Sequence, residues 1–113
     1  MAIITVAETP EFQRRARAIM SDEERMALID FIARNPTAGV SIGGGVRKLR
    51  FAREGGGKSG GYRVIHFYCG EDDIPIFLIT VFAKNEKANL TKTETETIKS
   101  LGKLLADNYR SAK

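Results

Sequence analysis

Residues 74–83, IPIFLITVFA, form a nearly continuous apolar run in this chain of 113 residues. Such a run is typical of a strand near the centre of a sheet, because a central strand is covered on at least one face. Pro75 fits near the beginning of the strand, where a missing backbone donor does least harm. We therefore take residues 74–83 as the central strand and build the rest of the fold around it.

Two further strands are predicted before this run. Residues 62–69, YRVIHFYC, are rich in β-branched and aromatic side chains, and residues 46–53, VRKLRFAR, alternate as a strand does. A short strand is also expected at residues 3–6. Residues 37–45, TAGVSIGGG, are expected to form a loop, because glycine is costly in regular structure.

Three helices are predicted from their start signals. Thr9 caps a first helix that begins at Pro10, and Ser21 and Thr91 each open a capping box with a glutamate three residues later. Asn35-Pro36 ends the second helix. The expected fold is α+β: two N-terminal helices, an antiparallel meander of three to four strands and a C-terminal helix, in one domain over residues 1–113. The apolar stripes expected on the helices are Phe12, Ala16, Ile19 and Met20; Leu28, Ile29, Phe31 and Ile32; and Ile98, Leu101, Leu104, Leu105 and Tyr109.

Composition indicates a soluble globular domain. Apolar residues make up 42% and charged residues 28%, and no apolar window approaches the length of a membrane span. The N-terminal residues lack the basic and apolar regions of a signal peptide. Cys69 is the single cysteine, which excludes an internal disulfide framework and fits a reducing cytoplasm. We expect a cytoplasmic protein without a cofactor; a metal site is not expected, because His66 and Cys69 fall on opposite faces of a strand.

The segment REGGGKSGGYR, residues 53–63, contains a GKS triplet but does not fit a phosphate-binding P-loop. The motif needs a glycine where Ala52 stands and a helix after Ser59, and the sequence continues instead as a strand. This segment is better interpreted as a basic loop between two strands.

The net charge is +4, and basic residues concentrate between residues 46 and 63. Such a stripe suits phosphate contacts, although cations also protect the edge of a sheet from unwanted pairing. Alternation places Arg47 and Arg53 on one face of their strand and Lys48 and Arg50 on the other. The sequence alone leaves both interpretations open.

Two more cations and one histidine are candidates for chemistry. Arg63 lies between apolar strand residues, and a half-buried arginine needs an anion, either an internal carboxylate or a ligand phosphate. Lys84 ends the apolar strand, where it either serves a site or marks the return to solvent. With Lys48 and Arg50, these cations lie on three adjacent predicted strands and could form a phosphate clamp. His66 is a reserve acid or base, or a structural residue.

The segments KSGGYRVI and FAKNEKANL, together with the order of elements, resemble the RelE/ParE superfamily of bacterial toxins. The match is nearest to its HigB-type, RelE-like branch and extends from about Thr9. The resemblance implies a toxin of a type II toxin–antitoxin pair that cuts mRNA in the ribosomal A site. It also implies that the catalytic cations are Arg63, Lys84, Lys48 and Arg50. A tyrosine that RelE has near the start of the last helix is absent, and Asn89-Leu90-Thr91 stands there.

The resemblance also implies partners. These are the ribosome, mRNA and a cognate antitoxin of HigA-like type with a helix-turn-helix domain. Arg47, Arg53, Lys58 and Lys87 are candidates to contact ribosomal RNA. Two other functions remain open at this point: a ParE-like toxin that inhibits gyrase without nuclease activity, and a non-catalytic RNA- or protein-binding module on the same fold.

Overall fold

The computed structural model describes residues 4–52, 61–71, 73–87 and 89–111. Its elements follow one another as five strands and three helices, and the expected α+β class is confirmed. Their order is β1 (Val6–Glu8), α1 (Pro10–Ile19), α2 (Asp22–Arg34), β2 (Val40–Gly43), β3 (Val46–Phe51), β4 (Tyr62–Phe67), β5 (Ile76–Ala83) and α3 (Lys92–Ser111). None of the described helices is both long enough and apolar enough to cross a membrane.

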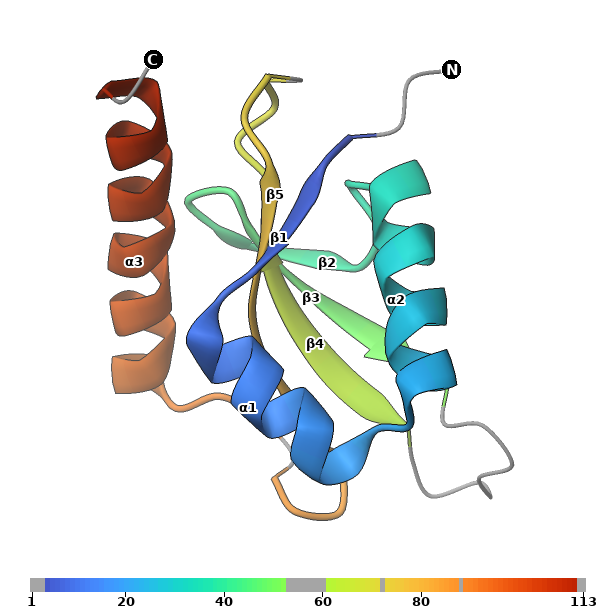
Figure 1. The fold of residues 1–113 in the computed structure, drawn as a ribbon. Coiled ribbons are helices and arrows are strands. Elements are labelled where there is room, and N and C mark those ends of the chain that lie inside the picture. The colour runs from blue at the N-terminus through green and yellow to red at the C-terminus, as the bar shows by residue number, and fades with distance from the viewer. Residues whose placement is uncertain (1–3, 53–60, 72, 88, 112–113) are drawn as a thin grey trace.

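The five strands form one mixed sheet with the order β1-β5-β4-β3-β2 (Figure 1). β2, β3, β4 and β5 pair antiparallel, as the predicted meander requires, whereas β1 runs parallel to β5. β4 is central, and all six of its residues are buried. The central position therefore belongs to β4 as well as to the apolar run in β5.

Three sequence predictions about strands need correction. The first strand is Val6–Glu8 and not residues 3–6, because the hydrogen-bonded partner of this segment is the beginning of β5. Residues 40–43 form a strand and not a loop, since they pair with β3 despite the glycines around them. β5 begins at Ile76, after Pro75.

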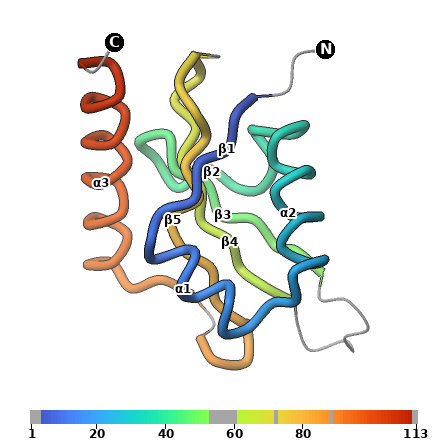
Figure 2. Tube along the Cα trace, viewed as in Figure 1, coloured from blue at the N-terminus to red at the C-terminus, as the bar shows by residue number. Residues whose placement is uncertain are grey.

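Helices cover both faces of the sheet (Figure 2). One apolar cluster joins α1 and α2 to the sheet through Phe12, Ala16, Leu28 and Ile32, and a second joins α3 through Ile98 and Ala106. The predicted stripes on α1 and α2 are largely confirmed, although Phe31 is 39% exposed. Leu104 and Tyr109, both predicted to lie in the apolar stripe of α3, are also exposed. The face toward α3 is the one that carries the cations described below.

The predicted capping boxes are present and fix where the helices begin. In α2, Ser21 and Glu24 exchange side-chain-to-backbone hydrogen bonds, and Thr91 and Glu94 do the same at the start of α3. The buried Glu24 carboxylate also accepts a hydrogen bond of 2.9 Å from the hydroxyl of Tyr62. This bond ties the turn between α1 and α2 to the residue of β4 that precedes Arg63.

Candidate functional site

Strand register brings three of the predicted cations together on the face toward α3. Arg50 of β3 lies directly opposite Arg63 of β4, and Lys48 precedes Arg50 by two residues on the same face. On the other side of Arg63, the paired residue is Phe82 of β5. We call Lys48, Arg50 and Arg63 the cation row. Lys84 follows two residues after Phe82, and its backbone N–H donates to the carbonyl of Gly61.

Arg63 is the unusual member of the cation row. It is only 7% exposed, yet its guanidinium makes no hydrogen bond or ion pair with any residue in the described part of the chain. Its cross-strand neighbour Arg50 is also without an acceptor there, and like charges directly opposite in a sheet destabilise it. A buried charge normally has a partner of opposite charge. The guanidinium of Arg63 therefore calls for an anion, and none of the described residues supplies it.

Lys48 differs from Arg63 because its ammonium group has a neutral partner. Nζ donates a hydrogen bond of 2.8 Å to Oδ1 of Asn89, in the segment between β5 and α3. This segment therefore reaches across the sheet from β5 to β3. Sequence reasoning did not assign a role to Asn89, since no local pattern indicates a contact between residues so distant in the chain.

The four residues predicted to contact RNA outside the cation row fall in different places. Arg47 lies on the other face of the sheet, and its guanidinium donates to the carbonyls of Ala38 and Gly39. Lys87 forms an ion pair with Glu94 and lies over the ring of Phe82, 5.8 Å from its centroid. Arg53 and Lys58 lie outside the described residues. Arg47 and Lys87 are thus held by the protein itself.

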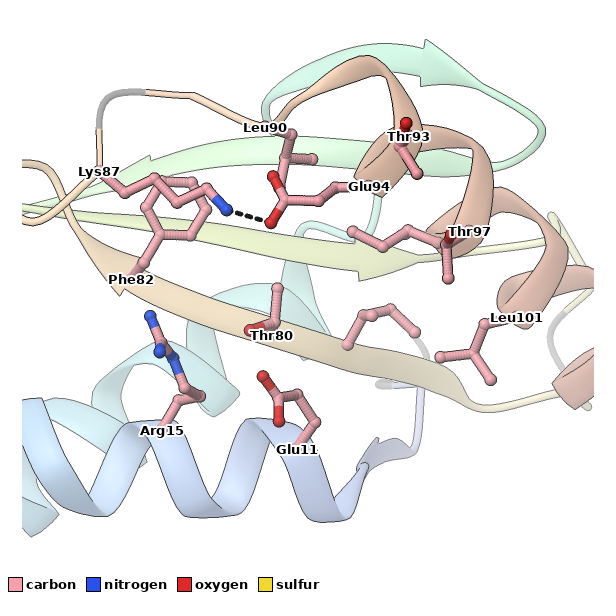
Figure 3. Close-up of a pocket in the computed structure, with 12 residues that line it drawn as sticks. Glu11, Arg15, Thr80, Phe82, Lys87, Leu90, Thr93, Glu94, Thr97 and Leu101 are labelled. Carbon is pink, nitrogen blue, oxygen red and sulfur yellow. Dashed lines mark hydrogen bonds and ion pairs between the residues drawn. The ribbon is translucent and has the colours of Figure 1, made fainter.

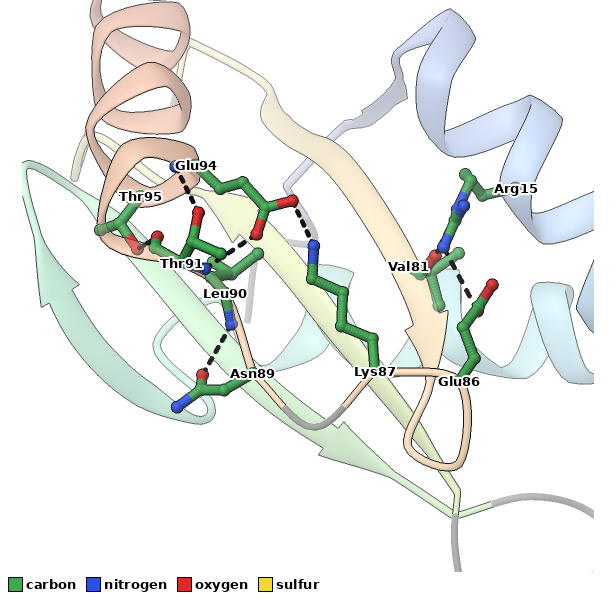
Figure 4. Close-up of polar contacts among 9 residues, drawn as sticks. All are labelled: Arg15, Val81, Glu86, Lys87, Asn89, Leu90, Thr91, Glu94 and Thr95. Atoms are coloured by element: carbon green, nitrogen blue, oxygen red, sulfur yellow. Dashed lines mark hydrogen bonds and ion pairs between the residues drawn. The ribbon is translucent and has the colours of Figure 1, made fainter.

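The Lys87–Glu94 pair belongs to a small network that joins the end of β5 to α3 (Figure 4). The hydrogen bond from Lys87 is the main cause that lowers the pKa of Glu94 below its ordinary value, and the backbone N–H of Thr91 adds to it. On the other side of β5, Arg15 of α1 donates to the carbonyl of Val81 and pairs with Glu86. Arg15 therefore lies against the edge of β5 at Val81.

A groove of about 340 Å³ lies beside the cation row, between α1 and the first half of α3 (Figure 3). Phe82, the β5 residue that pairs with Arg63, lines this groove, and so do Lys87 and Glu94. Its apolar lining is supplied by Ile79, Phe82, Leu90, Ile98 and Leu101. The groove arises from the distance between two helices, which the sequence does not specify locally.

His66 lies away from the cation row. It is fully buried on the face covered by α1 and α2, and Nε2 lies 2.9 Å from the carbonyl oxygen of Pro36. Nδ1 is buried and has no hydrogen-bond partner among the described residues. Because it is enclosed on the opposite face of the sheet, His66 is not part of the site that we propose below.

The surroundings of His66 predict a pH dependence of stability. Burial lowers the pKa of His66, the bond to Pro36 acts in the other direction, and the charge of Arg47 lowers it further. A histidine with a lowered folded pKa takes up protons more readily when unfolded, so stability falls as the pH drops below about 6.5. We expect chemical denaturation of the natural chain to show a steeper loss of stability between pH 7.5 and pH 5 than that of His66→Gln. Equal slopes would contradict this prediction.

Acidic, cysteine and histidine side chains do not gather on this surface. Within the described ranges, no three of these residues lie close enough together to hold a metal ion. The cation row itself offers fixed positive charges. Arginine presents a planar fork of donors to phosphate oxygens, and lysine presents a compact point charge.

The fold and the site define a class of protein: a small α+β protein whose mixed sheet carries, on one face, a row of cations without a carboxylate partner among the described residues. Residues 4–112 match the family described as the RelE toxin of the RelE/RelB toxin–antitoxin system. The match covers nearly the whole chain, and the chain belongs to this family. It is accordingly a toxin of a toxin–antitoxin system, and the partner that its family implies is an antitoxin.

Proposed function

We propose that this toxin is an endoribonuclease that cuts mRNA on the ribosome and thereby inhibits translation. The observation that supports this proposal best is the buried Arg63, which has no acceptor among the described residues and lies opposite a second arginine. A phosphate group would provide the missing anion. RNA supplies a continuous line of phosphates for Arg63, Arg50 and Lys48 together.

The proposed reaction uses the substrate's own 2′-hydroxyl. This hydroxyl gives up its proton to water or to a basic group, and its oxygen attacks the adjacent phosphorus to form a 2′,3′-cyclic phosphate. The bond to the 5′-oxygen of the next nucleotide breaks, and that oxygen takes up a proton. Arg63 and Lys84 stabilise the charge that develops on the phosphate oxygens. Lys48 and Arg50 bind flanking phosphates or assist proton transfer.

The ribosome would supply the orientation of the substrate. In-line attack requires that the 2′-oxygen, the phosphorus and the leaving oxygen are aligned, and alignment is a major part of such catalysis. The RelE family generally acts on ribosome-bound mRNA. A row made only of cations suits an enzyme whose substrate is held in place by the ribosome. We further propose that the antitoxin is of HigA-like type, with a helix-turn-helix domain.

Primer extension on a defined mRNA tests this function. The purified toxin, freed of antitoxin and shown to be folded, is incubated with the mRNA with and without translating ribosomes. We expect cuts inside the reading frame only when ribosomes are present. Cuts without ribosomes would contradict ribosome dependence. No cuts in either condition would contradict the nuclease and favour gyrase inhibition or a binding module.

A further inference from the structure

The side-chain oxygen of Asn89 accepts two hydrogen bonds, one of them from the cation row. Its Oδ1 accepts both from Nζ of Lys48, at 2.8 Å, and from the backbone N–H of Leu90, at 2.9 Å. Both partners are donors only, so the side-chain oxygen, and not the nitrogen, must face them. The orientation of the amide is therefore fixed by its contacts.

The segment that presents Asn89 is anchored on both sides. After it, Thr91 caps α3 through the reciprocal bonds with Glu94, and before it Lys87 pairs with the same glutamate (Figure 4). The side chain of Asn89 is already hydrogen-bonded to the backbone N–H of Leu90. It therefore loses little further conformational freedom when it binds Lys48. Asn89 is thus suited to hold a flexible lysine in one position.

The amide of Asn89 is neutral, and Lys48 forms no ion pair with a carboxylate within the described ranges, so its charge is not compensated there. Lys87, Arg15 and Arg110 each pair with a carboxylate, which cancels most of their attraction for a polyanion. Lys48 instead donates one of its three N–H bonds to an uncharged oxygen, and two donors remain for a ligand. The contact orders the ammonium group without neutralising it.

We propose that Asn89 is a positioning residue that fixes Nζ of Lys48 in the cation row and keeps its full positive charge available to an RNA phosphate. The inference rests on the proposed function, because it assumes that the row binds RNA. It makes two distinct claims. Removing the amide should cost order, whereas replacing it by a carboxylate keeps the oxygen acceptor and should cost the free positive charge.

Binding to a single-stranded RNA oligonucleotide with 2′-O-methyl groups tests both claims, because this probe cannot be cleaved. Its affinity for the purified toxin is measured by fluorescence anisotropy over a series of KCl concentrations. We expect Asn89→Ala to weaken binding about fivefold without changing the salt dependence. Asn89→Asp should weaken it further and reduce the slope of log K against log salt by about 0.7, the value for one phosphate contact on a single strand.

Two comparisons separate positioning from a structural or purely electrostatic effect. Asn108→Asp adds the same charge at an exposed position of α3 and should leave the slope nearly unchanged. In a Lys48→Met background, Asn89→Ala should have almost no further effect, because its partner is gone. An undiminished effect of Asn89→Ala in that background would overturn the proposal, as would equal slopes for Asn89→Asp and Asn89→Ala.

Failure of the inference can be told from failure of the proposed function. If the toxin cuts mRNA on ribosomes but Asn89→Ala weakens RNA binding just as much in the Lys48→Met background, only the inference is overturned. If the toxin binds the oligonucleotide with the expected pattern and does not cut mRNA, the inference stands for RNA binding and the nuclease is overturned. Absence of binding by the natural chain would overturn the inference.

Discussion

Replacing Arg63 by methionine is expected to reduce ribosome-dependent mRNA cleavage at least about 100-fold, since removing one donor that stabilises transition-state charge costs roughly 10²–10³ in rate. Methionine has a similar length and is uncharged, so it fills the buried site in β4. The same change removes a buried charge that has no acceptor among the described residues and lies opposite Arg50. Stability should therefore stay the same or rise by roughly 0.5–1 kcal/mol.

A loss of activity together with unchanged or higher stability is expected when the replaced residue serves function and not folding. The measurement pairs cleavage assays with thermal unfolding of the same preparations. Arg17→Met is the matched control, because Arg17 is exposed on α1 and has no ion pair or hydrogen bond within the described ranges. Full cleavage by Arg63→Met would remove the arginine from the mechanism. A large loss of stability would mean that Arg63 is a structural residue.

The elements that could be predicted from the sequence are those with local signals. The three helix starts were predicted because a capping box or a Thr-Pro pair specifies a helix N-terminus within four residues. β1 was misplaced and β2 was missed, because each is very short and has no pattern of its own. The partner of Val6 in β1 is Ile76, about seventy residues further on, and β2 is flanked by glycines.

The site was predictable to a similar extent. The shared face of Lys48, Arg50 and Arg63 follows from the alternation of side chains in a strand and from an antiparallel β3–β4 pair. The contact between Lys48 and Asn89 depends on how the segment after β5 crosses the sheet, which is a tertiary property. The burial of Arg63 without an acceptor in the described chain is also a tertiary property, since it depends on neighbours from three strands.

Gly102 shows why α3 can lie as close to the sheet as it does. The residue is in the middle of a helix, where glycine is about 1 kcal/mol less favourable than alanine. A Cβ atom at this position would lie 2.5 Å from Cδ1 of Phe67, a buried ring on the central strand β4. The unfavourable helix former is therefore explained by packing: the absence of a side chain lets α3 rest directly on this ring.

We expect Gly102→Leu to lower the free energy of unfolding by about 3 kcal/mol, near the upper end of the range for overpacking, because Phe67 is held in a central strand and cannot move aside. For a domain of this size the melting temperature should fall by roughly 10–15 °C, as followed by circular dichroism. Asn108→Leu, at an exposed position of the same helix, should change it little. If Gly102→Leu were as stable as the natural chain, α3 would not be seated on Phe67, and the anchor that places Asn89 beside Lys48 would be lost with it.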